Sequence, residues 1–162
     1  MAERWVVNAS SVILLGKAEV LRFLPLLGDE LVVPAGVVAE VQHRGAADAG
    51  HAWLNGEGRK FIRAALPLPD VLADWNGGAG EAEVMARALA FPGYTTVLDE
   101  RAARRKAAQI GVPVLGSLRV IVKAKERGLI PLARPALEKL RGSDAYVSDE
   151  LIDRAIALAG EA

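Results

Sequence analysis

Short apolar runs that alternate with helical patterns are the feature that most constrains how this chain can fold. The runs are rich in Val, Leu, Ile and Thr and lie at residues 5–7, 31–33, 61–66, 95–98 and 112–115. Between them, apolar residues recur at the spacing of an α-helix. Strands that alternate with helices are typical of sheets in which successive strands lie parallel and helices cover both faces. The sequence therefore predicts an α/β fold in three layers, a parallel sheet between two layers of helices.

Length and composition favour one domain over residues 1–162, because a chain of 162 residues with 52% hydrophobic content can bury a sizeable core. The chain has no cysteine, which excludes disulfides and thiolate metal sites, and its two histidines are too few for a His-rich zinc site. Any metal would bind to oxygen. The start lacks the pattern of a signal peptide, and no run approaches the ~20 apolar residues of a membrane span, so we expect a soluble cytoplasmic protein without membrane contact.

Two oxygen-bearing side chains follow predicted strands. Asn8 comes directly after the first strand, and Asp99 comes directly after the run at 95–98. Open α/β sheets bind ligands at the carboxyl ends of their strands, so both side chains are candidate site residues. The alternative is structural. Asn8 is a good turn residue, and the acid pair Asp99-Glu100 is favoured in the first turn of any helix because it faces the positive end of the helix dipole.

Two further acids lie on predicted helices. Glu40 lies on the rim of the apolar stripe of a helix at 34–44, where an acid can also simply bond to a neighbour. Glu81 precedes apolar residues by three, four and seven positions, which places its carboxylate on the inward side of its helix. Glu83 is four residues before Arg87, the spacing of a solvated ion pair. A buried charge needs a partner or a cation, so Glu81 is the predicted site residue of the two.

These four side chains would meet at one edge of the sheet, and their chemistry points to a metal. Carboxylate and amide oxygens suit Mg²⁺ or Mn²⁺. Such ions generate hydroxide and stabilise the charge of an in-line phosphoryl displacement. The set is Asn8, Glu40, Glu81 and Asp99.

Basic residues are concentrated in one segment, although 20 basic and 20 acidic residues give the chain a net charge of zero. Residues 101–127 hold eight basic residues and one acid. Within them, Arg101 and Arg105 stand one helical turn apart, and Arg119 and Lys123 repeat that spacing, so we predict that they bind a nucleic-acid backbone. Solvated helix faces carry similar charges. Ser117 opens the second of these helices, either as its N-cap or as part of a phosphate site.

The sequence resembles PIN-domain proteins, close to the branch of short proteins related to the VapC toxins of toxin–antitoxin pairs. The resemblance covers nearly the whole chain and rests on the order and spacing of VVNASSVILLGKAEVLRFL, VVPAGVVAEV, GAGEAEVMARAL and TVLDERAARRKAAQIGVPVLGSLRVIVKAKERGLI. It implies a parallel sheet of order 3-2-1-4-5 and metal-dependent endonuclease cleavage of RNA. By position, the family's metal site falls on Asn8, Glu40, Glu81 and Asp99. The resemblance also implies a small antitoxin partner and a homodimer.

The chain departs from the family at Asn8, where PIN nucleases usually have an aspartate, and at Ser11, which stands in place of a proline. An amide oxygen can contact a metal but brings no charge, so three carboxylates replace the usual four and metal affinity should fall. The leading prediction is a PIN-type ribonuclease. The alternative is a PIN fold with weakened catalysis that binds nucleic acid or protein. A phosphatase of the haloacid dehalogenase type fits poorly because it needs an aspartate nucleophile where Asn8 stands.

Overall fold

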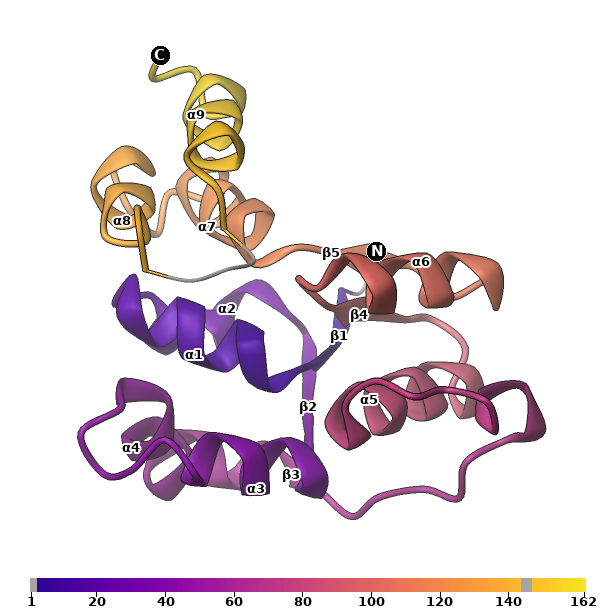
Figure 1. Ribbon diagram of the computed structural model, residues 1–162. Coiled ribbons are helices and arrows are strands. Elements are labelled where there is room, and N and C mark those ends of the chain that lie inside the picture. The colour runs from indigo at the N-terminus through magenta and orange to yellow at the C-terminus, as the bar shows by residue number, and fades with distance from the viewer. Residues whose placement is uncertain (1–2, 144–146) are drawn as a thin grey trace.

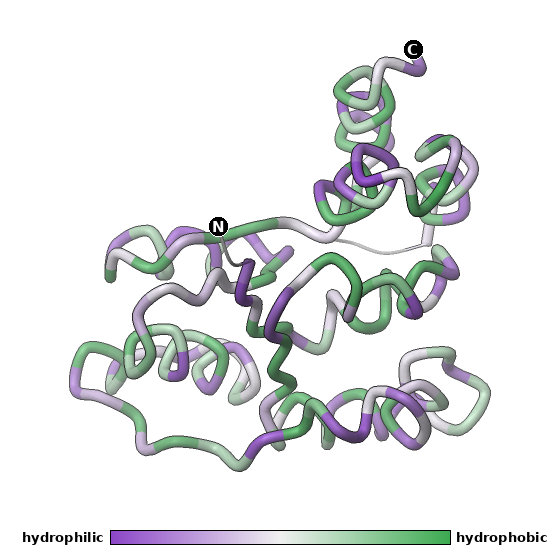
Figure 2. The backbone as a smooth tube through the Cα atoms, turned by 180° about the vertical axis from the view of Figure 1, so that it is seen from behind, coloured by the Kyte–Doolittle hydropathy of each residue, from purple (hydrophilic) through white to green (hydrophobic). Residues whose placement is uncertain are grey.

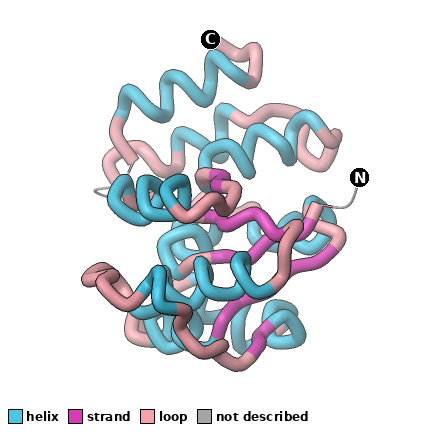
Figure 3. Tube along the Cα trace, turned by 90° about the vertical axis from the view of Figure 1, so that its right-hand side faces the viewer, coloured by secondary structure: helices cyan, strands magenta, loops and turns pink. Residues whose placement is uncertain are grey.

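The computed structural model describes residues 3–143 and 147–162, which form a parallel five-stranded sheet of order β3-β2-β1-β4-β5 with helices around it (Figure 1). Figure 3 shows the strands running through the molecule between the helices. The three-layer α/β fold and the strand order implied by the resemblance are both confirmed. The strands are β1 (Arg4–Val7), β2 (Glu30–Pro34), β3 (Ile62–Arg63), β4 (Tyr94–Val97) and β5 (Val114–Leu115).

The central strand β1 pairs in parallel with β2 on one side and with β4 on the other. Val6 lies opposite Val32 of β2 and Thr96 of β4, and all three are buried. Burial on both faces explains why these strands read as continuous apolar runs. Figure 2 shows the strands in the middle of the molecule as hydrophobic segments. Because all strands run the same way, the carboxyl ends of β1 and β4 meet at one edge.

Helices cover both sides of the sheet, with α1 on one side and α5 on the other (Figure 1). The α-helices are α1 (Ala9–Lys17), α2 (Leu24–Leu27), α3 (Ala35–Gln42), α4 (Ala49–Asn55), α5 (Ala79–Ala90), α6 (Arg101–Gln109), α7 (Ser117–Glu126), α8 (Arg134–Glu138) and α9 (Asp149–Leu158). Short 3₁₀ turns lie at η1 (Leu21–Phe23), η2 (Glu57–Phe61) and η3 (Asp70–Leu72). Among the described residues, no helix is both long enough and apolar enough to cross a membrane.

Two segments differ from the sequence prediction. The strand predicted at 61–66 is only the two residues of β3, which pair with the end of β2. Residues 18–26, whose apolar spacing predicts a single helix, are divided between η1 and α2. Pro25 explains the division, because proline lacks the N–H that a helix interior requires but is accepted in a first turn.

The last three helices pack together at the β5 end of the sheet, where α9 contacts both α7 and α8 (Figure 1). Ser148 caps α9 by accepting a hydrogen bond from the Leu151 amide at 3.2 Å. One face of α9 buries Ile152 and Ile156. Leu151 and Leu158 remain exposed on another face and border a cavity. The termini of α6, α7 and α9 therefore surround the region beyond β4 and β5.

Candidate functional site

A pocket of about 310 Å³ opens at the carboxyl edge of the sheet, beside the end of β1. We call it the acidic pocket because three glutamates line it. The structure brings together here three of the four residues predicted to form the site. The lining residues are Asn8, Ala9, Ser10, Ile13, Glu40, Arg44, Gly78, Glu81 and Glu100.

Asn8 joins β1 to α1 and is 3% exposed. It is the N-cap residue of α1, but its side chain makes no capping bond. The Asn8 amide nitrogen donates to Ser10 Oγ at 3.5 Å, whereas Asn8 Oδ1 has no hydrogen-bond partner among the described residues. A buried polar atom without a partner costs about 1–3 kcal/mol, so a ligand that contacted this oxygen in the pocket wall would be stabilising.

Glu40 and Glu83 hold α3 and α5 together by capping each other's helix. Glu40 of α3 accepts a hydrogen bond from the Gly80 amide of α5 at 2.9 Å, and Glu83 of α5 accepts one from the Gly36 amide of α3 at 3.0 Å. Both amides lie in the first turn of their helix, where backbone N–H groups have no intrahelical acceptor. The predicted ion pair of Glu83 with Arg87 is wrong, because Arg87 donates instead to a backbone carbonyl. Glu40 keeps its second carboxylate oxygen for other contacts.

Glu81 is buried, 6% exposed, as its helical spacing predicted. Its carboxylate accepts a hydrogen bond from the Gly78 amide at 3.0 Å, which caps the start of α5. Burial, a hydrogen bond with Glu100 and the negative charges of Glu100 and Glu40 together raise the pKa of Glu81 to about 7. Crowded carboxylates of this kind are stabilised by a proton or by a cation.

Asp99 is not among the residues that line the acidic pocket, but it contacts one of them, Ser10. Its carboxylate accepts hydrogen bonds from the Ser117 amide at 2.8 Å, from Ser117 Oγ at 2.6 Å, from Ser11 Oγ at 3.0 Å and from Ser10 Oγ at 3.3 Å. It thereby ties the first turn of α1 to the first turn of α7. Asp99 also lines a second, larger cavity of about 600 Å³. The structure does not place Asp99 among the lining residues of the acidic pocket and places its neighbour Glu100 there instead.

Glu100 is a site candidate that the sequence analysis did not select. The Leu98 amide donates to the Leu115 carbonyl at 3.0 Å, so the sheet pairing continues past β4 up to the acid pair. Glu100 then has extended dihedral angles (φ −66°, ψ 133°) as the N-cap residue of α6. Successive side chains of extended backbone point in opposite directions, so Asp99 and Glu100 face different cavities. In the sequence, the position of Glu100 directly after Asp99 at the end of a predicted strand was the feature that could have identified it.

The predicted RNA-binding residues divide into two groups. Arg101 and Arg119 line the larger cavity. Arg105 is exposed on α6 outside that lining, and Lys123 has its amino group 3.8 Å from the Glu3 carboxylate. Ser117 is fully buried and both of its polar groups donate to Asp99, so the geometry places it as an internal contact and not as a free phosphate site. The N-cap residue of α7 is Gly116, so the prediction that Ser117 caps this helix is wrong.

The acidic pocket has the donor chemistry of a magnesium or manganese site. As they stand, the side chains of residues 3–143 and 147–162 include no group of three or more His, Asp or Glu arranged to hold a metal ion. The pocket nevertheless combines an unpaired buried amide oxygen, that of Asn8, with three carboxylates, one of which has a raised pKa. Oxygen donors and negative charge are what these hard cations require, so the residues present fit such an ion.

Comparison with known protein families agrees with this fold. The model of the PIN domain matches residues 4–161, so the chain belongs to the PIN-domain family. This is a nuclease-type fold, and PIN domains are generally nucleases that act on nucleic acid and use divalent metals. Neither the comparison with curated proteins nor that with solved structures found a match.

Proposed function

We propose that this protein is a metal-dependent endoribonuclease and the toxin of a toxin–antitoxin pair. The observation that carries the proposal is the acidic pocket, where the unpaired Asn8 oxygen lies in one wall with the carboxylates of Glu40, Glu81 and Glu100. Like charges crowd there at the carboxyl edge of a parallel sheet, which is where α/β folds bind ligands. A divalent cation would relieve the crowding and use the free oxygen.

In this proposal Glu40, Glu81 and Glu100 hold Mg²⁺ or Mn²⁺ and Asn8 supplies a neutral oxygen. When bound, such an ion would supply an activated water and would stabilise the charge that develops on the phosphate. Glu100 takes the place that the sequence analysis gave to Asp99. Asp99 acts as a positioning residue, since its four hydrogen bonds fix the starts of α1 and α7 beside the pocket. Glu81, whose pKa is near neutrality, can hold a proton until the cation binds.

The proposed substrate is RNA, held by Arg101 and Arg119 in the larger cavity and by Arg105 of α6 and Lys123 of α7. The resemblance to VapC toxins supports three further parts of the proposal. These are a small antitoxin protein that inhibits the nuclease, a homodimer in solution, and a cytoplasmic location.

An RNA-cleavage assay with Mn²⁺, Mg²⁺ or chelator tests the catalytic proposal. We expect wild-type protein to cleave RNA with either ion and to be inactive in chelator. Glu100→Gln should lose cleavage and Mn²⁺ binding. Glu57→Gln is the matched control, because Glu57 is exposed on η2, away from the pocket. Equal activity of the wild type and Glu100→Gln would contradict the role of Glu100, and activity in chelator would contradict the need for metal.

A second candidate function follows from Asn8. An amide at this position removes one negative charge from the pocket, which favours a PIN fold that binds nucleic acid or protein with weakened catalysis. The same assay separates the two candidates. Wild-type protein that binds RNA but does not cleave it with either ion, and whose Asn8→Asp variant does cleave it, would be this binding module.

A further inference from the structure

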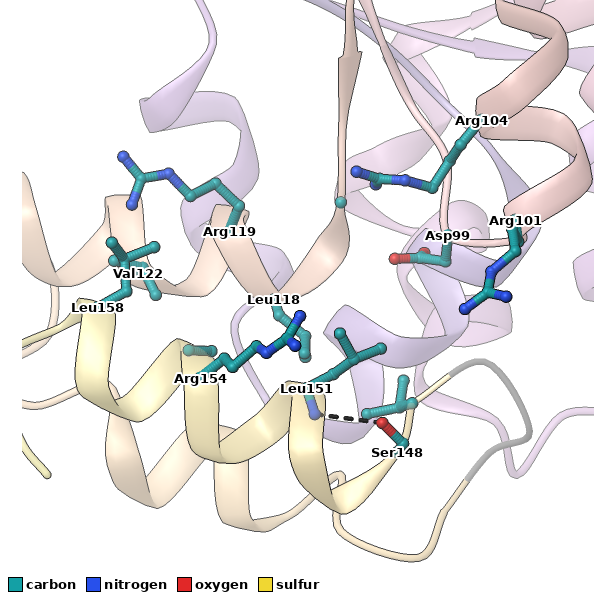
Figure 4. Close-up of a pocket in the computed structure, with 13 residues that line it drawn as sticks. Asp99, Arg101, Arg104, Leu118, Arg119, Val122, Ser148, Leu151, Arg154 and Leu158 are labelled. Carbon is teal, nitrogen blue, oxygen red and sulfur yellow. Dashed lines mark hydrogen bonds between the residues drawn. The ribbon is translucent and has the colours of Figure 1, made fainter.

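The larger cavity, of about 600 Å³, lies between α6, α7 and α9 (Figure 4). We call it the arginine cavity. Its volume is within the range of about 300–1,000 Å³ that small-ligand pockets occupy. Four arginines line it, from three separate helices: Arg101 and Arg104 of α6, Arg119 of α7 and Arg154 of α9.

The charge of the arginine cavity is positive. Asp99 is the acid in its lining, and Ser10, Ser11 and Ser117 already donate hydrogen bonds to that carboxylate. Arg104 uses one N–H on the Leu98 carbonyl at 3.0 Å and keeps its other donors. The cavity therefore offers several guanidinium donors to a ligand that carries negative charge.

Two of the arginines have carboxylate partners that a phosphate can displace. Arg154 Nη2 lies 2.8 Å from Glu150 Oε1, and Arg119 Nη1 lies 3.5 Å from Glu126 Oε1. Both pairs are partly or largely exposed to solvent, and exposed ion pairs contribute only about 0–1 kcal/mol. Exchange of these partners for a doubly hydrogen-bonded phosphate costs little.

One wall of the arginine cavity is apolar. It is made by Leu118 and Val122 of α7 and by Leu151 and Leu158 of α9. Leu151 is 41% exposed and Leu158 is 59% exposed, so an apolar face of a ligand could cover both side chains. Ser148 Oγ on this side accepts one hydrogen bond, from the Leu151 amide, and its hydroxyl keeps its donor for a ligand. A ligand with one anionic part and one flat, weakly polar part fits both walls.

The arginine cavity adjoins the acidic pocket at a shared wall, since Ser10, which lines the acidic pocket, donates a hydrogen bond to Asp99, which lines the arginine cavity, at 3.3 Å. We propose that the arginine cavity seats the nucleotide next to the phosphate that is cut, with its phosphate on Arg101, Arg104 and Arg154 and its base or sugar against Leu151 and Leu158. This inference rests on the proposed ribonuclease function and deepens it, because it assigns α9 to the substrate site.

Continuity with the acidic pocket favours RNA over an acidic protein helix as the occupant. Ser10 of the acidic pocket donates to Asp99 of the arginine cavity at 3.3 Å, so an RNA strand with one phosphate beside Glu100 can reach the arginine cavity with its next nucleotide. The absence of aromatic side chains from the described lining predicts that the base is held by desolvation and not by stacking, so sequence preference at this position should be weak.

The test is binding of a short labelled single-stranded RNA by fluorescence anisotropy, in chelator so that the RNA stays intact, over a range of salt. Arg154→Ala should weaken binding about threefold to tenfold and reduce the slope of log K against log salt by about 0.7. Leu158→Glu should weaken binding at least as much, because it places a carboxylate in the cavity on an exposed position that leaves the fold intact. Arg59→Ala is the matched control, an exposed arginine on η2, and should bind as the wild type does.

Wild-type binding by both Arg154→Ala and Leu158→Glu would overturn the inference, even if the protein cleaves RNA and the proposed function stands. Conversely, loss of binding in these variants supports the inference even if no cleavage is found with Mn²⁺, in which case the proposed function fails alone. Absence of RNA binding by the wild type at low salt would also overturn it. So would unchanged RNA binding by Leu158→Glu together with loss of a co-expressed partner protein, which would make this wall a protein interface.

Discussion

Replacing Asp99 by alanine should destabilise the protein strongly, whereas replacing its neighbour Glu100 by glutamine should not. The reason lies in the hydrogen bonds. Asp99 accepts four of them and Ser117, its main donor, is fully buried. Glu100 instead adds negative charge beside Glu81.

The magnitude follows from the donors that Asp99→Ala leaves behind. Ser11 Oγ can donate to the Val97 carbonyl, 3.1 Å away, and Ser10 is partly exposed, so these two lose little. The amide and the hydroxyl of Ser117 would stay buried without their acceptor, at about 1–2 kcal/mol each. The expected loss is therefore about 2–4 kcal/mol in the free energy of unfolding, or about 5–15 °C in Tm for a chain of this size.

Thermal and urea unfolding in chelator at pH 8 measure this difference. Asp99→Asn, which keeps the volume but not the charge, should lose about half as much as Asp99→Ala. Glu100→Gln should match the wild type or exceed it, because it removes one of two crowded carboxylates. An unchanged Tm for Asp99→Ala, or a larger loss for Glu100→Gln than for Asp99→Ala, would refute the assignment of the two acids to opposite cavities.

Three other predictions concern the acidic pocket and its supporting helices. The pKa of Glu81 is raised from 4.5 to about 7 in the folded protein, so the folded state favours the protonated carboxyl. The stability that comes from this preference is fully present below about pH 4.5 and is lost as the pH rises to 7. Glu81→Gln should remove that decline and gain about 1–2 kcal/mol over the wild type at pH 8 in chelator, with little gain at pH 4.5, and an equal gain at both pH values would contradict the shift. Asn8→Asp should tighten Mn²⁺ binding in a calorimetric titration, because it replaces the neutral amide in the pocket wall by a negatively charged carboxylate. Unchanged affinity would show that residue 8 does not contribute to the metal site. Glu83→Ala should lower the free energy of unfolding by about 1 kcal/mol, because the Gly36 amide loses its hydrogen-bond acceptor. An unchanged urea unfolding curve would indicate instead that Glu83 is simply a solvated side chain.

Much of the fold could be predicted because it depends on local pattern. The alternation of strands and helices identified a parallel α/β sheet, since strands buried on both faces must be continuously apolar. The period of 3.6 residues correctly turned Glu81 inward. Prediction failed where a partner from another part of the chain decides the outcome. The strand predicted at 61–66 shrinks to β3 because only its start finds a partner in β2.

By itself, the sequence determined which acids follow strands or lie on inward helix faces, because strand ends and helical spacing are properties of neighbouring residues. It placed Asn8, Glu40 and Glu81 near one edge of the sheet. Only the tertiary structure decided which cavity each acid of the pair Asp99-Glu100 enters. That choice depends on where α5 and α7 pack relative to the end of β4, since Ser117 of α7 captures one carboxylate and Glu81 of α5 meets the other.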